Sequence, residues 1–402
     1  MIICNLRQNK YGKRRNATPT IRVVPIVVLF CLTVILIIFP TVSHGDETGS
    51  RFFWESIGGP NGDTDLRDIV IDPRDDNIWY VGSQNNGLYV TRDGGNSWTS
   101  FLGGTIGSIV IDPYYYDIYA SSGSDLYRST DLGLSWDLVV PFPNTIPGPS
   151  GDSPTFINSV LVSYSPGWIA VGLSSTLHSA RIYLTNDHGG TWWVSWESPI
   201  GYHIWDMLED PYWGSWTFCT EDANHNANPV VMRSIDMGTT WQEIPALTGV
   251  PTSGHGLNLD INFWTGTIYF LRECSLLSVS NDSGVTWSPS GAHFVGFGST
   301  MLLDSGCPNR IFGGEMVRGL SDGGVFVSED WGQTFSFLGL PNNTVSSLAI
   351  DSSSTILIAV SDYGLWTMDL TIDDNISCDG FWTILSDGFE SGDTYRWSIS
   401  ED

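Results

Sequence analysis

Residues 91–101 read TRDGGNSWTSF, and five further stretches of the chain follow the same pattern. Each stretch has an Asp, a Gly two positions later, a Ser or Thr at the fourth position and an aromatic residue at the fifth. The Asp, Gly and aromatic residues of the six copies are Asp93, Gly95 and Trp98; Asp131, Gly133 and Trp136; Asp187, Gly189 and Trp192; Asp236, Gly238 and Trp241; Asp282, Gly284 and Trp287; and Asp330, Gly332 and Phe335. A carboxylate that accepts turn N–H groups, a glycine with positive φ and a packing aromatic ring are typical of a hairpin turn. The pattern therefore predicts a structural role for these residues.

The spacing of the copies predicts the number of repeats. Consecutive copies are 38, 56, 49, 46 and 48 residues apart, which suits one four-stranded sheet per repeat. A second pattern, an alternating strand that ends in a polar residue, occurs seven times, first as DIVIDP at 68–73. The seventh unit (344–370) has three strands and no turn motif, and the strand RFFWESIG (51–58) is available to complete it. We therefore expect an all-β fold, a seven-bladed β-propeller over residues 51–370 that is closed by its N-terminal strand.

The turn motif resembles the Asp-box, or BNR repeat, of β-propellers. Proteins with this repeat include sialidase-like, sortilin-like and photosystem II assembly factor-like propellers. The resemblance implies that the six turns lie at the periphery of the blades, away from the face that binds ligands.

The two ends of the chain differ from the repeats. Residues 1–45 contain six basic residues and no acid, and residues 23–39 carry no charge. This pattern predicts a signal peptide or an uncleaved N-terminal membrane anchor, and hence a secreted, extracellular or periplasmic protein, or one anchored by this segment. Residues 371–402 are predicted to be an acidic C-terminal tail. Four cysteines follow the leader, and they predict disulfides with three alternative pairings: Cys219, Cys274, Cys307 and Cys378.

The excess of acidic over basic residues limits the classes of molecule that the chain is expected to bind. Beyond residue 45 the chain keeps 11 Arg and 44 acids, a net charge of −33. This field repels nucleic acid and anionic membranes, so membrane contact is expected only through the N-terminal segment. We expect a monomer whose partner is an extracellular protein or a carbohydrate. No cofactor is predicted, although calcium suits the carboxylates of the tail and axis; the sequence assigns no metal site.

Candidate binding residues lie on the innermost strand of each blade, which lines the axis of a propeller. When the seven strands are aligned on their terminal polar residue, each strand carries a polar residue four positions earlier. The residue seven positions earlier is expected to lie at the rim of the axial channel. Because side chains alternate along a strand, we expect the first set to face the axial channel. The candidates for ligand binding are Asp65, Asp68, His203, Trp205, Asp206, His255 and Asn258.

Three functions are compatible with these features. The favoured one is a non-catalytic binding or structural module with its ligand on the axial face. The alternative is a glycoside hydrolase of the sialidase or xyloglucanase type, for which Asp68 and Asp206 are the only acid pair to nominate. The chain lacks the sialidase F/Y-R-I-P motif, and Gln84 occupies the position of the xyloglucanase catalytic Asp. An assembly factor similar to the photosystem II propellers is less well supported, because a positive patch is expected of that group.

Overall fold

The computed structural model describes residues 53–143, 145–146, 153–175, 180–198, 203–221, 229–244, 256–272, 276–293, 297–318 and 321–372. The leader, the tail beyond residue 372, His255, Cys274 and Cys378 lie outside the described residues. The expectations for these segments therefore stay predictions.

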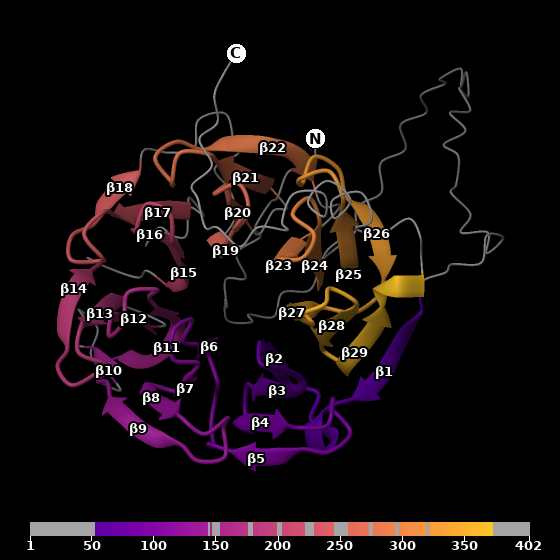
Figure 1. Ribbon diagram of the computed structural model, residues 1–402, viewed down its shortest axis with the longest axis horizontal. Coiled ribbons are helices and arrows are strands. Elements are labelled where there is room, and N and C mark those ends of the chain that lie inside the picture. Colours follow the sequence, from indigo (N-terminus) through magenta and orange to yellow (C-terminus); the bar gives the residue numbers. More distant parts are fainter. Residues whose placement is uncertain are drawn as a thin grey trace, which may run out of the picture. The chain divides into compact units, whose positions relative to one another are not determined.

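The described strands form seven antiparallel sheets, the blades, around a central axis (Figure 1). Blades 1 to 3 contain β2 (Leu66–Asp72), β3 (Asp75–Ser83), β4 (Leu88–Thr91) and β5 (Thr99–Phe101); β6 (Ile109–Ile111), β7 (Ile118–Ser122), β8 (Asp125–Ser129) and β9 (Asp137–Pro141); and β10 (Thr145–Ile146), β11 (Ser153–Val162), β12 (Ile169–Ser175), β13 (Arg181–Thr185) and β14 (Trp193–Glu197). Blades 4 to 6 contain β15 (Ile204–Asp210), β16 (Ser215–Glu221), β17 (Pro229–Ser234) and β18 (Gln242–Ile244); β19 (Gly256–Ile261), β20 (Ile268–Arg272), β21 (Leu276–Ser280) and β22 (Ser288–His293); and β23 (Phe297–Leu303), β24 (Ile311–Arg318), β25 (Ser321–Ser328) and β26 (Ser336–Gly339). Blade 7 contains β27 (Val345–Ile350), β28 (Ile356–Ser361), β29 (Gly364–Asp369) and β1 (Trp54–Gly58), and two short 3₁₀ turns lie at Pro60–Gly62 and Leu370–Ile372.

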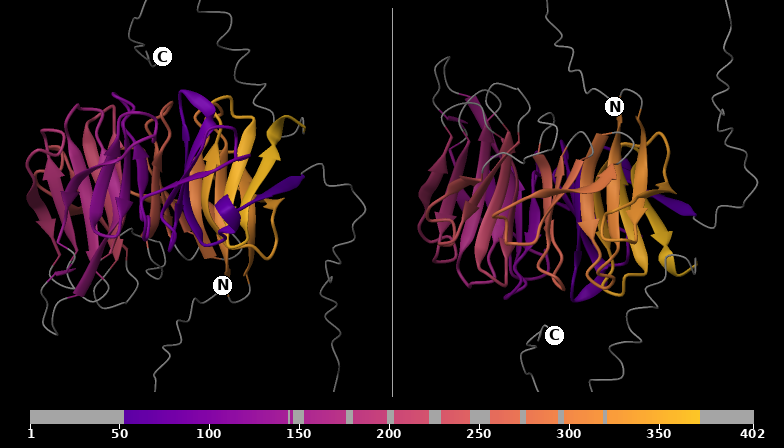
Figure 2. Two further views of the ribbon diagram at one scale, coloured as in Figure 1. Left: turned by 90° about the horizontal axis from the view of Figure 1, so that it is seen from below. Right: turned by 90° about the horizontal axis from the view of Figure 1, so that it is seen from above.

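The two ends of the propeller meet in blade 7. β1 pairs antiparallel with β29 and supplies the outer strand of this sheet, with Glu55 opposite Thr367 (Figure 1). Closure of this kind leaves β29 without an open edge. The predicted seven-bladed, all-β fold and its closure by the N-terminal strand are therefore confirmed. Side views show that the strands of all blades run between the same two faces of the ring (Figure 2).

The hydrophobic core is divided among the boundaries between blades. The buried apolar side chains form seven clusters, one at each boundary between neighbouring blades. Between blades 1 and 2, for example, Tyr80 and Val90 pack against Ile106 and Ile118. Each fully buried residue of this size stabilises the fold by about 1.5–3 kcal/mol. Side-chain packing at these boundaries is thus one of the interactions that hold neighbouring blades together.

The six repeated motifs form one type of turn, which lies immediately before the outermost strand of blades 1 to 6. In blade 2, Asp131 Oδ1 accepts hydrogen bonds from the Ser129 hydroxyl (2.8 Å) and the Ser135 N–H (2.9 Å), and Oδ2 accepts one from the Ser135 hydroxyl (2.6 Å). The Ser129 hydroxyl in turn accepts the N–H of Gly133 (2.8 Å). Equivalent bonds recur around each of the other five carboxylates. The carboxylates are thus engaged by their own turns.

The glycine of the motif meets two requirements at once. Gly133 has φ 78°, and a Cβ placed on it would lie 2.8 Å from the ring of Tyr80 in the preceding blade. The residue before the glycine also has positive φ, as at Leu132 with φ 62°. This strained position is occupied by glycine in the first copy alone, so it could not be identified from composition.

The aromatic residues of the motif link each blade to the one before it. Trp136 of blade 2 packs against the cluster between blades 1 and 2, and Trp192 of blade 3 against the cluster between blades 2 and 3. Blade 7 has no such motif, but Trp54 at the start of β1 packs into the boundary with blade 6, and its Nε1 donates to the carbonyl of Leu338 (3.2 Å). Trp54 therefore takes the place of the missing aromatic residue in the seventh repeat.

Candidate functional site in the axial cavity

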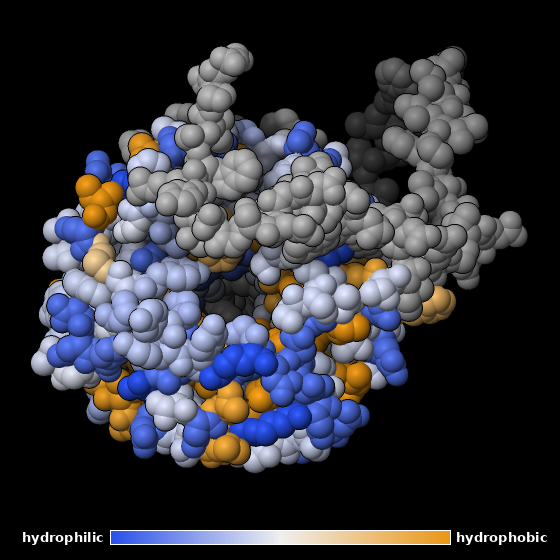
Figure 3. All heavy atoms as spheres, in the orientation of Figure 1, coloured by the Kyte–Doolittle hydropathy of each residue, from blue (hydrophilic) through white to orange (hydrophobic). Residues whose placement is uncertain are grey.

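The inner strands of all seven blades surround a cavity of about 580 Å³. The space-filling view shows the molecule hollowed near its centre (Figure 3). The cavity is lined by the seven polar residues predicted to face the axis: Asp68, Ser108, Ser159, Asp206, Asn258, Thr300 and Ser347. We refer to these seven residues as the polar ring. A concave, partly polar cavity with aromatic residues at its wall is a default candidate for a binding site.

A β-bulge next to the polar ring adds a second set of lining residues. In six inner strands the register shifts immediately before the ring residue, as between Leu66 and Asp68 in β2. The skipped residues all line the cavity, and they are Arg67, Asn158, Trp205, Leu257, Ser299 and Ser346. Two consecutive side chains per strand therefore reach the axis, which strict alternation does not allow. The side chains of Arg67 and Asn158 were missed for this reason.

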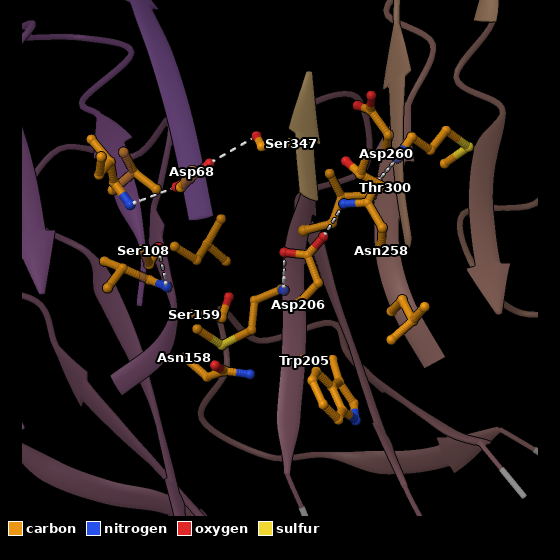
Figure 4. A pocket seen from close by; sticks show the side chains of 18 of the residues that line it. Asp68, Ser108, Asn158, Ser159, Trp205, Asp206, Asn258, Asp260, Thr300 and Ser347 are labelled. Carbon is orange, nitrogen blue, oxygen red and sulfur yellow. Dashed lines mark hydrogen bonds between the residues drawn. The ribbon is translucent and has the colours of Figure 1, made fainter. Parts of the chain in front are cut away.

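The polar ring is hydrogen-bonded across the boundaries between blades. Asp68 accepts the backbone N–H of Ile109 in blade 2 (3.1 Å) and the hydroxyl of Ser347 in blade 7 (3.1 Å) (Figure 4). It also accepts the N–H of Ile69 on its own strand (2.9 Å). One carboxylate thus connects three blades.

Asp206 makes the corresponding connection on the opposite part of the ring. Its Oδ2 accepts the side-chain amide of Asn258 (2.8 Å) and the N–H of Leu259 (2.9 Å), both in blade 5, and its Oδ1 accepts the N–H of Met207 (2.8 Å) (Figure 4). Asn258 then accepts the N–H of Met301 in blade 6 (3.0 Å). The structure therefore brings together Asp206 and Asn258 among the predicted residues, and both are engaged in joining blades.

Burial perturbs the ionisation of the axial acids. It raises the pKa of Asp206 to about 6, with a smaller contribution from the charge of Asp68, while N–H donors from Leu259 and Met207 oppose the shift. Burial also raises the pKa of Asp68. Desolvation disfavours the charged form of a carboxyl group, and perturbed acids in a cavity are candidates for acid–base chemistry as well as for structural pairing.

Two further acids in the cavity were not singled out by sequence reasoning. Glu209 and Asp260 occupy inner-strand positions that are apolar in the other six blades, and both line the cavity. Asp260 Oδ2 accepts the N–H of Leu303 (2.9 Å), and burial raises its pKa to about 7. Glu209 accepts the N–H of Tyr164 (2.8 Å), and burial raises its pKa as well. Comparison of the repeats with each other was the signal that could have identified both.

The rim residues are placed differently from the polar ring. Asp65 is exposed, and its carboxylate accepts a hydrogen bond from the side-chain amide of Asn85 in the same blade. The ring of His203 lies 6.0 Å from that of Phe156 and 5.5 Å from that of Trp205, measured between centroids. Of the predicted rim residues, the structure thus gathers His203 and Trp205 beside Phe156, away from Asp65. His255 lies outside the described residues.

The structure also bears on the expectations about disulfides, metal binding and a membrane-spanning segment. Cys219 is a fully buried free thiol, so it does not belong to a disulfide pair. Within the described ranges, no group of three or more His, Cys, Asp or Glu side chains could hold a metal ion. No helix among the residues that the structure describes could span a membrane; the predicted leader is not part of that range.

No protein-family model matches the sequence, and no curated protein matches it. Solved structures share the fold. YCF48 bound to D1 peptide is 16% identical with a TM-score of 0.55, over 79% of this chain and 94% of that one. The GH74 xyloglucanase from Xanthomonas campestris is 14% identical with a TM-score of 0.57, over 79% of this chain and 53% of that one. The extracellular domain of the hybrid two component system BT4673 from B. thetaiotaomicron is 13% identical with a TM-score of 0.56, over 78% and 39%. The chain thus spans about half the length of the xyloglucanase and less than half of the BT4673 domain. Sequence identities this low show that the fold is shared, and nothing more.

Proposed function

We propose that this chain is an exported Asp-box β-propeller that acts as a non-catalytic binding module, with a protein or carbohydrate ligand on its axial face. The basic and apolar leader supports export, and the six turns support membership of the Asp-box class. One observation carries the proposal of a non-catalytic role. Both oxygens of Asp68 and both oxygens of Asp206 accept hydrogen bonds, and each carboxylate accepts at least one of them from a neighbouring blade.

A hydrolase of the retaining or inverting type needs two carboxyl groups that can reach the scissile bond and exchange protons with the leaving group or with water. Carboxylates that hold the blades together are poorly placed to exchange these partners during turnover. The cavity wall also offers an aromatic surface, where Trp205 lies beside His203 and Phe156. Rings at a concave mouth suit recognition of an apolar side chain or of a sugar ring.

A glycan array and a peptide array, both probed with protein 46–402, test this proposal. We expect a ligand whose affinity falls by about ten-fold in His203→Ala and Trp205→Ala, because each truncation removes an aromatic contact. Thr105→Ala, at the rim position of blade 2, is the matched control and should bind normally. Equal binding by all three variants, at unchanged melting temperature, would place the ligand elsewhere.

Glycoside hydrolysis is the second candidate, and the raised pKa values of Asp68 and Asp206 favour it. An acid whose pKa is about 6 can donate a proton near neutral pH. The screen uses xyloglucan, sialyllactose and aryl glycosides as substrates. Turnover by the wild type that Asp206→Asn abolishes, with an unchanged melting temperature, would establish the hydrolase and overturn the non-catalytic role.

A further inference from the structure

Eight large aromatic side chains stand exposed on the face that carries the repeated turns, opposite the rim. They occupy the connections that follow the inner strand of blades 2 to 5, and we call them the aromatic belt. Their exposed fractions are Tyr114 61%, Tyr115 47%, Tyr116 41%, Tyr164 43%, Tyr212 60%, Trp213 79%, Phe263 42% and Trp264 50%. Isolated exposed apolar residues are ordinary, whereas several on neighbouring connections mark a surface that is covered by something else.

Contacts between blades join several members of the belt. The rings of Tyr164 in blade 3 and Phe263 in blade 5 lie 6.3 Å apart at an interplanar angle of 76°. The hydroxyl of Tyr212 in blade 4 donates to the carbonyl of Phe263. Trp264 extends the belt toward blade 6, where its Nε1 donates to the carbonyl of Ser305 (2.9 Å). These contacts thus join the aromatic connections of blades 3, 4 and 5, and Tyr114 of blade 2 packs against Tyr115.

The backbone beneath the belt is fixed before any ligand arrives. The terminal polar residue of each inner strand accepts N–H groups of the connection that follows it. Asp112 accepts the N–H of Tyr114 (2.7 Å), and Asp210 accepts the N–H of Tyr212 (2.9 Å). Asn262 does the same for Trp264 (2.9 Å). Rings that are held in place lose little conformational entropy on binding, which favours affinity.

The belt is uncharged, although the whole chain carries a net charge of −27. The acids in these connections, Asp112, Asp117 and Asp210, are buried, and the connections contain no Lys or Arg. A polyanion would be repelled by the surrounding field, and a polycation would find no exposed carboxylate between the rings. The charge pattern therefore favours an uncharged ligand with flat apolar faces.

Two members of the aromatic belt also line the axial cavity. Tyr164 and Phe263 line the cavity together with Glu209 and Asp260, the two acids that replace apolar residues of the other blades. Carboxyl groups beside aromatic rings offer hydrogen-bond acceptors for hydroxyl groups. The C–H faces of a pyranose ring suit stacking on the electron-rich face of an aromatic ring.

We propose that the aromatic belt is a second binding surface, separate from the axial rim, that takes a chain of neutral sugars. The sugar rings stack on Trp213, Trp264 and their neighbours, and hydroxyl groups of one unit reach the carboxyl groups at the end of the cavity. The inference does not depend on the ligand of the axial rim, because the two surfaces are on opposite faces and use different residues.

Native affinity electrophoresis of protein 46–402 tests the belt, with gels that contain xyloglucan, galactomannan or mixed-linkage β-glucan. We expect at least one neutral polysaccharide to retard the wild type and Trp213→Ala to weaken the affinity roughly ten-fold. Trp213 is 79% exposed, so its truncation should leave the melting temperature unchanged. Tyr363→Ala is the matched control, because Tyr363 is 60% exposed and lies on the opposite face.

The remaining outcomes overturn the proposal. These are no retardation in any of the three neutral gels, equal retardation of the wild type and Trp213→Ala, or equal retardation by polygalacturonate, which is anionic. A protein occupant would appear as an oligomer in sedimentation that Trp213→Ala disrupts without any effect of the polysaccharides. Loss of glycan binding in His203→Ala but not in Trp213→Ala would assign the sugar to the axial rim.

Discussion

At the scale of single residues, carboxylates have two opposite environments in this fold. The carboxylates of the repeated turns are exposed and receive hydrogen bonds from Ser and Thr hydroxyls and from N–H groups; the bonds from Ser135 and Ser129 lower the pKa of Asp131 to about 2. The axial carboxylates are buried, and burial raises the pKa of Asp206 and Asp260 to about 6 and about 7. The same side chain therefore contributes to stability in opposite pH ranges.

These shifts predict how stability depends on pH. An unfolded Asp titrates near pH 4, so between about pH 4 and 7 the folded chain holds more protons at Asp206 and Asp260 than the unfolded chain does. The free energy of unfolding should therefore rise as the pH falls from 8 to about 5. Below about pH 4 the unfolded chain takes up protons at the turn carboxylates before the folded chain does, so their contribution is lost and stability should fall again.

Thermal unfolding between pH 3 and 8 measures this dependence. In Asp260→Asn the increase in melting temperature from pH 8 to 5 should be smaller than in the wild type, because one of the titrating groups is gone. A melting temperature that decreases steadily from pH 8 to 5 would contradict the raised pKa values.

At the scale of the structural element, β1 shows how a strand from the other end of the chain completes a repeat. It pairs with β29 through the backbone, and Trp54 fills the boundary with blade 6. A Cβ at Gly339 would lie 2.7 Å from the ring of Trp54, so the glycine makes room for this side chain. The closure therefore depends on one aromatic residue as well as on strand pairing.

Trp54→Ala should lower the free energy of unfolding by about 2–4 kcal/mol, because it empties a partly buried site at the closing boundary. Phe53→Ala is the control, since Phe53 is 74% exposed and its truncation should have little effect. Deletion of residues 51–58 should lower the melting temperature further and cause aggregation through the open edge of β29. Urea denaturation and light scattering check these outcomes; a stable monomeric deletion variant would argue against closure through β1.

At the scale of the whole molecule, the repeat made the fold predictable and the boundaries between blades limited the prediction of the site. Blade size follows from the spacing of Asp93 and its equivalents, blade number from the seven inner-strand patterns, and closure from the unpaired strand at 51–58. The polar ring was also visible, since alternation orients Asp68 and Asp206 toward the axis. The partners of these carboxylates were not visible, because Ile109 and Leu259 belong to other blades. The bulges that turn Arg67 and Trp205 inward have no marker in the sequence.

The aromatic belt, on the face opposite the rim, also depends on contacts between blades that the sequence does not show. The letters YYY at 114–116 and YW at 212–213 are plain in the sequence. They lie in connections between strands, where the strand pattern gives no prediction. The connections of blades 2 to 5 become neighbours only in the circular arrangement of the blades. Prediction therefore worked within a repeat and failed where neighbouring repeats meet.

If the axial carboxylates hold the blades together, the free energy of unfolding in urea should fall in Asp206→Ala. Removal of this carboxylate leaves the N–H of Leu259 and the amide of Asn258 without their partner in a buried place. The account predicts a loss of about 3 kcal/mol, while Asp65→Ala on the exposed rim changes stability by less than about 0.5 kcal/mol. An unchanged or increased free energy of unfolding in Asp206→Ala would contradict the account, because a carboxylate kept at a cost in stability would be serving a ligand or a reaction.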